Sequence, residues 1–328
     1  MILAGDIGGT TTRLAVYEQE HQGLKSVVEK DYPSGEYSGL DAVAREFLGA
    51  QDYKLERACF GIAGPIRDGH VETPNLPWQI DARELARELH IHSVDLINDL
   101  EAHAYGLPLL AVKDFTILHP GAPDAKGNQA IIAAGTGLGE AGLIWDGKAH
   151  IPYSTESGHA DFAPRNELEI GLLRYLLRES KDHVSYERVI SGPGLYNVYR
   201  FLRERGEYPE PPWLVEQLKN ADPAAAITQA GLAGTCRLCS QALDLFVSCY
   251  GAEAGNLALR AMATGGIFIG GGIAPKILTK LKEPPFLEAF FAKGRMRTLV
   301  EQIPVRVILN DKAALLGAAN YALLHSES

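Results

Sequence analysis

The sequence has 328 residues, which is enough for about two domains that each bury a core of their own. Hydrophobic residues make up 46% and charged residues 22%, a composition typical of globular proteins and not of disordered, fibrous or membrane-spanning chains. With 41 acidic against 31 basic residues the formal net charge is -10, so the chain offers no positive field to a phosphodiester backbone. We therefore expect no nucleic-acid partner.

The four cysteines are too few for a disulfide framework in a chain of this length, which favours a reducing, cytoplasmic location. The start of the chain lacks the basic and apolar regions of a signal peptide, and no run approaches the roughly 18 apolar residues that cross a bilayer. We therefore expect no membrane partner. Cys236 and Cys239 would be half of a zinc site without a second pair, so ordinary packing is the better interpretation.

Two segments of the chain have the same pattern of strand, glycine-rich turn and strand. Residues 2–17 place a turn at 5–12 between two apolar runs, and residues 130–145 repeat this around 135–139. The two copies predict two related α/β halves, each opening with a hairpin. Two unrelated hairpins are the alternative, which this one pair of short matches leaves open.

Between the hairpins, Asp81 and Glu84 have the spacing of a helix N-cap. A short apolar strand over 94–97 then ends at Asn98 and Asp99, and a helical stretch follows over 101–105. Asp99 is therefore expected at the carboxyl end of a strand, where open α/β sheets bind their ligands.

The second half has signals of both helix and strand. The expected elements are a helix over 167–177, a proline-rich loop over 208–213, a long helix over 236–261, a strand over 267–269, a helix with Pro275 at its first position, a strand over 305–309 and an alanine-rich C-terminal helix.

The glycine turns are suited to binding phosphate, because without a side chain the backbone N–H groups can approach an anion closely. Residues 137–142 match the glycine spacing of dinucleotide-binding folds, but a strand follows where that fold needs a helix, so we reject this interpretation. The chain also lacks Gly-Lys-Ser/Thr and the protein-kinase signatures. Phosphate would then be held by amides, threonine hydroxyls and a metal ion, without a lysine.

Asp6 stands at the end of the first strand, where a carboxylate can orient hydrated Mg²⁺ against nucleotide phosphates. For this residue alone, capping of its own turn is the commoner role.

A second set of polar residues comprises Asn98, Asp99, Glu156, His159 and Glu187. Sugar hydroxyls donate and accept hydrogen bonds, so a sugar site needs such a mixture of carboxylates, an amide and an imidazole. Glu156-x-x-His159 also has the spacing of a di-iron ligand pair, but the intervening Ser and Gly disfavour a helix and no second copy exists. For His159 alone, a structural histidine is the better interpretation.

Seven motifs occur in order: Asp6-Ile-Gly-Gly-Thr10, Gly61-Ile-Ala-Gly-Pro65, Ile97-Asn-Asp99, Gly135-Thr-Gly-Leu-Gly139, Glu156-Ser-Gly-His-Ala-Asp-Phe-Ala-Pro164, Glu187-Arg-Val-Ile-Ser-Gly-Pro-Gly194 and Gly270-Gly-Gly-Ile-Ala-Pro275. Together they resemble the bacterial glucokinases, a hexokinase-like, non-ROK group of the actin, hexokinase and sugar kinase superfamily. The related ROK kinases carry a zinc-binding cysteine cluster after their Gly-His, and this chain has none there.

The resemblance implies an α/β fold of two duplicated ribonuclease-H-like (actin-like ATPase) domains with an interdomain cleft. The small domain would comprise 1–110 plus 305–328, and the large domain 111–304. A homodimer is expected only at the level of the family.

The implied activity is phosphorylation of the 6-hydroxyl of glucose by ATP with Mg²⁺, which yields glucose 6-phosphate and ADP. Asp99 would be the catalytic base. The residues implied to bind the sugar are Asn98, Asp99, Glu156, His159, Glu187, Gly64 and Pro65. Those implied to bind the nucleotide are Asp6, Ile7, Gly8, Gly9, Thr10, Thr11, Gly135, Thr136, Gly137, Gly139, Gly271 and Gly272, with Asp6 holding Mg²⁺ through water.

Three other functions are considered. The acceptor could be another hexose or an amino sugar on the same fold. A non-enzymatic, sugar-responsive regulator usually carries an N-terminal helix-turn-helix, whereas here the first strand is expected from residue 2, and the acidic charge also disfavours it. An actin-like or chaperone-like ATPase would give no reason for the Glu156, His159 and Glu187 motifs.

Overall fold

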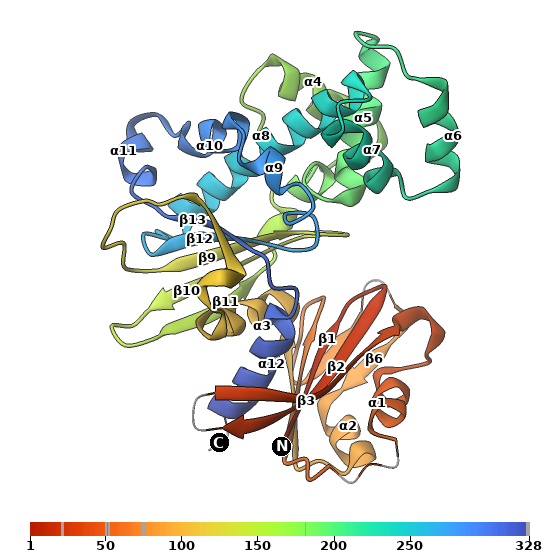
Figure 1. Cartoon of the computed structure of the whole chain (residues 1–328), viewed down its shortest axis with the longest axis vertical. Helices are drawn as coiled ribbons and strands as arrows, with labels where there is room; N and C mark the ends of the chain where they lie inside the picture. Colours follow the sequence, from red (N-terminus) through yellow and green to blue (C-terminus); the bar gives the residue numbers. More distant parts are fainter. Residues whose placement is uncertain (21–22, 50, 52, 74–75, 181, 326–328) are drawn as a thin grey trace. The chain divides into compact units, whose positions relative to one another are not determined.

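The computed structural model describes residues 1–20, 23–49, 51, 53–73, 76–180 and 182–325. The chain divides into two compact units (Figure 1). The first comprises residues 1–114, 152–154 and 310–328, and the second comprises residues 115–151 and 155–309.

The first unit is built on a five-stranded sheet in the order β3-β2-β1-β4-β7. Strands β1, β2 and β3 are antiparallel neighbours, whereas β4 and β7 continue the sheet parallel to β1. The elements are β1 (Ile2–Ile7), β2 (Thr11–Glu20), β3 (Gly23–Pro33), α1 (Leu40–Leu48), β4 (Arg57–Ile62), the two-stranded pair β5 (His70–Glu72) and β6 (Gln79–Asp81), α2 (Ala82–Leu89), β7 (Ser93–Asn98), α3 (Asp99–Gly106) and α12 (Ala313–Leu324).

Both faces of this sheet are buried, because successive side chains of a strand point to opposite faces. Leu3 belongs to the cluster that includes buried residues of α1 and α2, whereas Ile2 and Ala4 belong to the cluster that includes α3 and α12. Figure 1 shows α1 and α2 on one side of the sheet and the C-terminal helix α12 on the other. Helix α12 therefore completes a core whose other residues lie near the start of the chain.

The local predictions for this unit are confirmed. The Asp81 carboxylate accepts a hydrogen bond from the Glu84 N–H at 2.9 Å and so caps α2. Strand β7 ends at Asn98, and α3 begins at Asp99.

The second unit contains a six-stranded sheet in the order β11-β10-β9-β12-β13-β8. Its strands are β8 (Phe115–His119), β9 (Gln129–Ala134), β10 (Leu138–Trp145), β11 (His150–Thr155), β12 (Gly266–Gly270) and β13 (Val305–Ile308), although residues 152–154 of β11 group with the first unit. The β9–β10 hairpin is antiparallel, and β12 and β13 extend the sheet parallel to β9. This is the arrangement of the first unit with the edge strand β8 added, so the predicted internal repeat is a repeat of topology.

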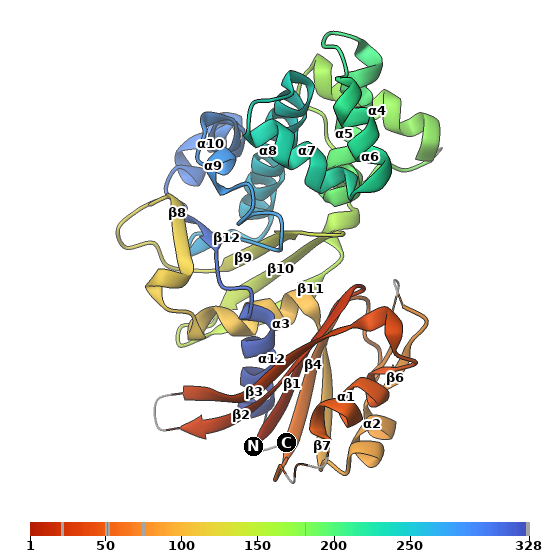
Figure 2. The same ribbon diagram turned by 45° about the vertical axis from the view of Figure 1, so that its right-hand side comes forward.

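The helices of the second unit pack on one face of its sheet (Figure 2). They are α4 (Glu167–Ser180), α5 (Gly192–Arg205), α6 (Pro212–Asn220), α7 (Pro223–Leu232), α8 (Arg237–Arg260), α9 (Leu278–Leu281), α10 (Pro284–Phe291) and α11 (Arg297–Val300). Helix α8 is the long helix predicted over 236–261, and most of its residues are buried. The Cys236 sulfur caps it by accepting from the Cys239 N–H at 3.4 Å.

Three boundaries differ from the sequence predictions. Helix α6 begins at Pro212, inside the expected loop over 208–213, because proline is tolerated in the first turn of a helix. Pro275 does not start a helix: residues 271–277 form turns and α9 begins at Leu278. Residues 305–308 belong to the second unit and not to the small domain, because β13 pairs with β12 and β8.

None of the helices in the described ranges combines the length and the hydrophobicity that crossing a membrane requires.

Candidate functional site

In the first unit, the carboxyl ends of three parallel strands bring the predicted residues together. The strand register places Asp6 of β1 beside Gly61 of β4, and Gly61 beside Ile97 of β7. Asn98, the next residue of β7, lies beside Ile62 of β4. The predicted substrate residues 64–65 follow β4 directly, and Gly64 has the positive φ of 117° that a glycine tolerates at a sharp turn.

Asn98 has a structural use that the sequence prediction did not assign. Its side-chain oxygen caps α3 by accepting from the Leu100 N–H at 2.9 Å and the Glu101 N–H at 3.4 Å. This leaves the amide nitrogen of Asn98 to donate to a ligand. The cap also fixes the first residue of α3, Asp99, whose carboxylate accepts from Leu100 N–H at 3.0 Å.

Burial and nearby charges act on the carboxyl groups of both Asp99 and Asp6. Burial raises the pKa of Asp99, His103 lowers it, and the negative charge of Asp6 raises it further. Burial likewise raises the pKa of Asp6, against the opposing effects of His103 and Arg13. A carboxylate whose pKa lies above its ordinary value is a stronger base, which is the property that proton abstraction needs.

His103 is a neighbour of both carboxyl groups that the sequence analysis missed. It lies one helical turn after Asp99, and its Nδ1 donates to the Asp99 backbone oxygen at 3.0 Å. The i, i+4 spacing from Asp99 on the predicted helix was a signal that could have identified it.

The turn between β1 and β2 is held from β3 by a second missed residue. Ser34 is buried, its hydroxyl donates to the Gly8 oxygen at 2.8 Å, and its backbone N–H donates to the Thr10 oxygen at 3.0 Å. The buried Thr12 hydroxyl contacts the Ser34 hydroxyl at 2.9 Å. Gly9, Thr10 and Thr11 are exposed, so the turn is fixed from behind while its outer surface stays accessible.

In the second unit, the glycine turn over 135–139 contacts the segment that precedes α5. The Gly192 N–H donates to the Gly135 oxygen at 2.8 Å, and the Leu138 N–H donates to Glu187 Oε2 at 3.0 Å. A Cβ at Gly137 would lie 2.5 Å from that Glu187 oxygen, so only glycine lets the carboxylate lie over the turn.

A short helical turn, η4 (Ser157–His159), packs on strand β10; Glu156 precedes this turn and His159 is its last residue. A Cβ at Gly158 would lie 1.9 Å from the Leu138 backbone oxygen, so this close approach requires glycine. His159 Nε2 lies 4.0 Å from Glu187 Oε1, and the two side chains are 62% and 30% exposed. Three separate sequence motifs therefore meet in this unit, with an imidazole and carboxylates accessible to a ligand.

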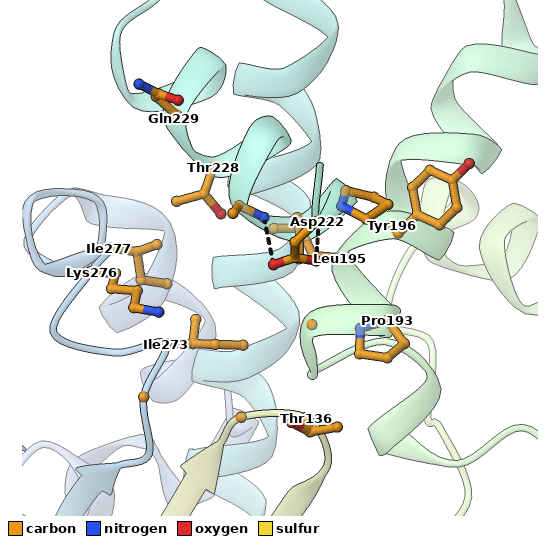
Figure 3. Close-up of a pocket in the computed structure, with 16 residues that line it drawn as sticks. Thr136, Pro193, Leu195, Tyr196, Asp222, Thr228, Gln229, Ile273, Lys276 and Ile277 are labelled. Carbon is orange, nitrogen blue, oxygen red and sulfur yellow. Dashed lines mark hydrogen bonds between the residues drawn. The ribbon is translucent and has the colours of Figure 1, made fainter. Parts of the chain in front are cut away.

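A cavity of about 860 Å³ opens next to the 135–139 turn (Figure 3). Its walls come from the β9–β10 turn, the starts of α5 and α7, and the turn after β12, where Gly272 lies. The lining residues are Gly135, Thr136, Gly192, Pro193, Leu195, Tyr196, Asp222, Pro223, Ala224, Ala225, Thr228, Gln229, Gly272, Ile273, Lys276 and Ile277. Most of this lining is apolar, as is usual in pockets that bind small molecules.

Two charged side chains line this cavity. Asp222 caps α7 by accepting from the Ala224 and Ala225 N–H groups at 3.2 and 3.3 Å. The Lys276 ammonium is directed into the space between the walls (Figure 3). The sequence analysis predicted phosphate binding without a lysine and did not single out Lys276, which follows the glycines of β12 and not those of the β9–β10 turn.

Comparison with known proteins identifies the family. A family model described as Glucokinase matches residues 3–325. The glucokinase of Trichormus variabilis is 44% identical over 334 residues, which covers 97% of this chain and 98% of that protein. The glucokinase of Escherichia coli O1:K1 is 38% identical over 317 residues, covering 96% of this chain and 95% of that protein. The chain belongs to the glucokinase family.

The solved structure of a glucokinase from an Antarctic psychrotroph matches this chain with a TM-score of 0.84, at 33% identity and 98% coverage of each chain. The predicted fold class is confirmed: both units are variants of the actin-like ATPase fold. The activity of this glucokinase-family chain is the ATP-dependent phosphorylation of glucose.

The predicted site residues gather in two groups, one in each unit. Asp6, Asn98, Asp99, Gly64 and Pro65 gather at one edge of the first sheet. The second unit gathers Glu156, His159, Glu187, the 135–139 turn and Gly272, and Gly271 adopts a φ of 79° directly after β12. Within the described ranges, no group of three or more His, Cys, Asp or Glu side chains is arranged to hold a metal ion.

Proposed function

We propose that Asp99 is the catalytic base that accepts the proton of the glucose 6-hydroxyl as its oxygen attacks the γ-phosphorus of ATP. One observation carries this proposal: Asp99 is held at the start of α3 beside Asp6, and burial together with that neighbouring charge raises its pKa. Phosphoryl transfer needs little covalent help from the protein beyond alignment and stabilisation of charge. A positioned base adds to this by removing the proton that the new ester bond cannot keep.

We assign the remaining sugar contacts to side chains of complementary types. The Asn98 amide nitrogen can donate, the Glu156 and Glu187 carboxylates can accept, and His159 can do either according to its tautomer. The Gly64–Pro65 turn is assigned a backbone contact to the sugar. Oε2 of Glu187 already accepts a hydrogen bond from the Leu138 N–H. Its other oxygen, Oε1, lies on the His159 side and is available to a sugar hydroxyl.

We assign the adenosine of ATP to the cavity and the phosphates to the two glycine turns. Ile273, Ile277 and Leu195 provide apolar surface for the adenine ring. Gly135 and Thr136 line the same cavity, so a nucleotide there would meet the N–H groups of the 135–139 turn. The turn over residues 7–11 is assigned the terminal phosphates.

The Asp6 side chain fits a role toward Mg²⁺. It is a partly buried carboxyl group next to a second one, Asp99, and burial raises the pKa of each, so two negative charges here are poorly solvated. A nearby divalent cation would offset that excess of negative charge, and Mg²⁺ keeps water molecules through which a single carboxylate can bind it. When bound with ATP, Mg²⁺ would neutralise charge on the phosphate oxygens.

Lys276 should strengthen ATP binding through its charge. We expect Lys276→Met, which keeps most of the aliphatic stem, to raise the KM for ATP about tenfold with little change in kcat, the lower end of what a hydrogen bond to a charged group contributes. Adenosine, which has no phosphate, should bind both proteins equally. Lys282→Met is the matched control, because Lys282 is an exposed lysine six residues away that does not line the cavity. A KM for ATP that is unchanged in Lys276→Met would contradict this role.

The activity itself is tested by steady-state ADP release with ATP and Mg²⁺ on glucose, mannose, fructose and glucosamine. We expect the highest kcat/KM with glucose, and values at least tenfold lower with the other sugars, because a sugar that leaves polar groups of the site unpaired binds poorly. A preference for glucosamine would favour the amino-sugar kinase. Sugar binding without turnover on any of the four would favour the regulator.

Cytoplasmic location and a homodimer are further proposals that rest on the family. Light scattering coupled to size-exclusion chromatography would measure the mass against the 35.5 kDa of one chain.

A further inference from the structure

A buried polar cluster lies in the second unit behind the 135–139 turn. Glu140 of β10 and Glu253 of α8 are both fully buried, with relative exposures of 0%. Arg260 of α8 forms an ion pair with each of them, at 3.0 Å from Nη2 to Glu140 Oε2. One guanidinium therefore faces two carboxyl groups.

If both carboxyl groups are ionised, the cluster has two negative charges for one guanidinium and too few hydrogen-bond donors for the carboxylate oxygens. The Glu140 Oε1 atom is buried and has no hydrogen-bond partner among the described residues. The group within its reach is the Glu253 carboxyl, and two ionised carboxylates can only accept hydrogen bonds. Lys293, a further cation on which Glu253 acts, donates to the Asn256 side chain at 2.7 Å and to the Ala252 oxygen at 2.8 Å. A proton on one carboxyl group would supply the missing donor and leave one negative charge for Arg260.

Hydrogen bonds connect this cluster to Tyr186, the residue before Glu187 of the proposed sugar site. The Asn256 amide donates to Glu253 at 2.9 Å and to the Tyr186 hydroxyl at 3.0 Å. The residue after Tyr186 is Glu187, whose carboxylate accepts from the Leu138 N–H of β10, two residues before Glu140. The polar contacts therefore run from β10 through α8 to the Glu187 segment and back to β10.

We propose that Glu140 and Glu253 share a single proton, and that the neutral member of this pair positions Glu187 against the 135–139 turn for glucose binding. The positioning role rests on the proposed function of Glu187, whereas the shared proton does not. Glu140 and Glu253 are positioning residues here, because they act on the sugar only through Glu187.

The pKa shifts of the groups in and around the cluster agree with a proton shared by Glu140 and Glu253. Burial and the neighbouring Glu253 together raise the pKa of Glu140 to about 8, against the opposing effect of Arg260. Burial lowers the pKa of Lys293 to about 8 and raises those of Tyr186 and Tyr250. The ionisable groups that act on the cluster are Glu253, Arg260 and Tyr250 of α8, Lys293 after α10, Tyr186 before α5, and Arg165, which acts on Lys293.

The sign of the pH effect follows from linkage. Because the folded-state pKa of Glu140 lies above the ordinary value of 4.5, the folded protein holds the proton more tightly than the unfolded chain does. The stabilising contribution of this proton is complete below pH 4.5 and is lost as the pH rises toward about 8.

The test compares two substitutions of the same kind, Glu140→Gln and Glu169→Gln. Gln at 140 copies a protonated carboxyl group, since its NH2 can donate to Glu253 while its oxygen accepts from Arg260. Glu169 is also buried, at 1% exposure, but it accepts from Arg165 and Asn166 in a network with enough donors, so it needs its charge.

We expect thermal unfolding between pH 5 and 8.5 to separate the two variants. The wild-type melting temperature should fall as the pH rises, whereas Glu140→Gln should lose most of that dependence and melt about 5 °C or more above wild type at pH 8.5. Glu169→Gln should melt below wild type at every pH. Destabilisation of Glu140→Gln like that of Glu169→Gln at all pH values would overturn the shared proton, whether or not the protein phosphorylates glucose.

The positioning role has a separate readout, the KM for glucose as a function of pH. We expect this KM to rise at least fivefold in wild type between pH 7 and 9, and to rise less than twofold in Glu140→Gln with kcat nearly unchanged. Parallel KM profiles for the two proteins would refute positioning of Glu187 while leaving the stability result intact.

Discussion

Asp99→Asn should lower kcat by roughly 10²- to 10⁴-fold while the dissociation constant for glucose changes by less than about threefold. The amide keeps the size of the carboxyl group, and its oxygen can still accept from the Leu100 N–H, so the start of α3 should be preserved. What it cannot do is accept the proton of the attacking hydroxyl. Steady-state kinetics with glucose and ATP, paired with calorimetric titration of glucose, would separate the loss of turnover from a loss of binding.

Glu101→Gln is the matched control for this experiment, because Glu101 lies two residues further along α3 and is also a partly buried carboxyl group whose pKa burial raises. Its kcat should stay within about twofold of wild type. If Asp99→Asn also retained near-normal turnover, another group would have to be the base, and the proposed mechanism would fail.

Gly158→Ala should reduce kcat/KM for glucose by about 100-fold and also lower the melting temperature. The new methyl carbon would lie 1.9 Å from the Leu138 oxygen and 2.8 Å from the Leu138 carbonyl carbon, and both are backbone atoms of a paired strand that cannot rotate away. The η4 turn must therefore move, carrying Glu156 and His159 with it. A displacement of about 1 Å in positioning groups is enough for an effect of this size.

Gly171→Ala is the control in the same unit. It lies inside α4, where a Cβ would meet the ring of Phe201 at 3.3 Å, and a side chain can adjust while alanine favours the helix. We expect kcat/KM within twofold of wild type and a melting temperature within about 2 °C. Normal glucose kinetics in Gly158→Ala would mean that the η4 turn does not position the sugar.

Some features of this protein could be predicted from local sequence alone. The two hairpins, the Asp81 cap and the strand that ends at Asn98 each depend on residues a few positions apart, so hydrophobic alternation and turn chemistry predict them directly. The polar motifs were also visible in the sequence, because Glu156, His159 and Glu187 each stand in a segment rich in glycine or proline, where neither helix nor strand explains them.

Other assignments needed the tertiary structure. The sequence analysis placed residues 305–308 with the small domain, but this strand pairs with β12 of the second unit. A short apolar strand does not by its own sequence specify its neighbour, because the pairing depends on the whole sheet. Lys276 and Ser34 have no local signal of function, because Lys276 lines a cavity with residues distant in the chain and Ser34 bonds to a turn 26 positions away.

The sequence by itself determined the hairpins and the Asp81 cap, since these follow from contacts within one turn or one strand, and it indicated the types of residue proposed to bind a sugar and a phosphate. Only the tertiary structure decided that Glu140 of β10 and Glu253 of α8, 113 positions apart, are both fully buried and face one arginine. Burial changes the ionisation of such groups, and burial is a property of the packed chain that no short stretch of sequence contains.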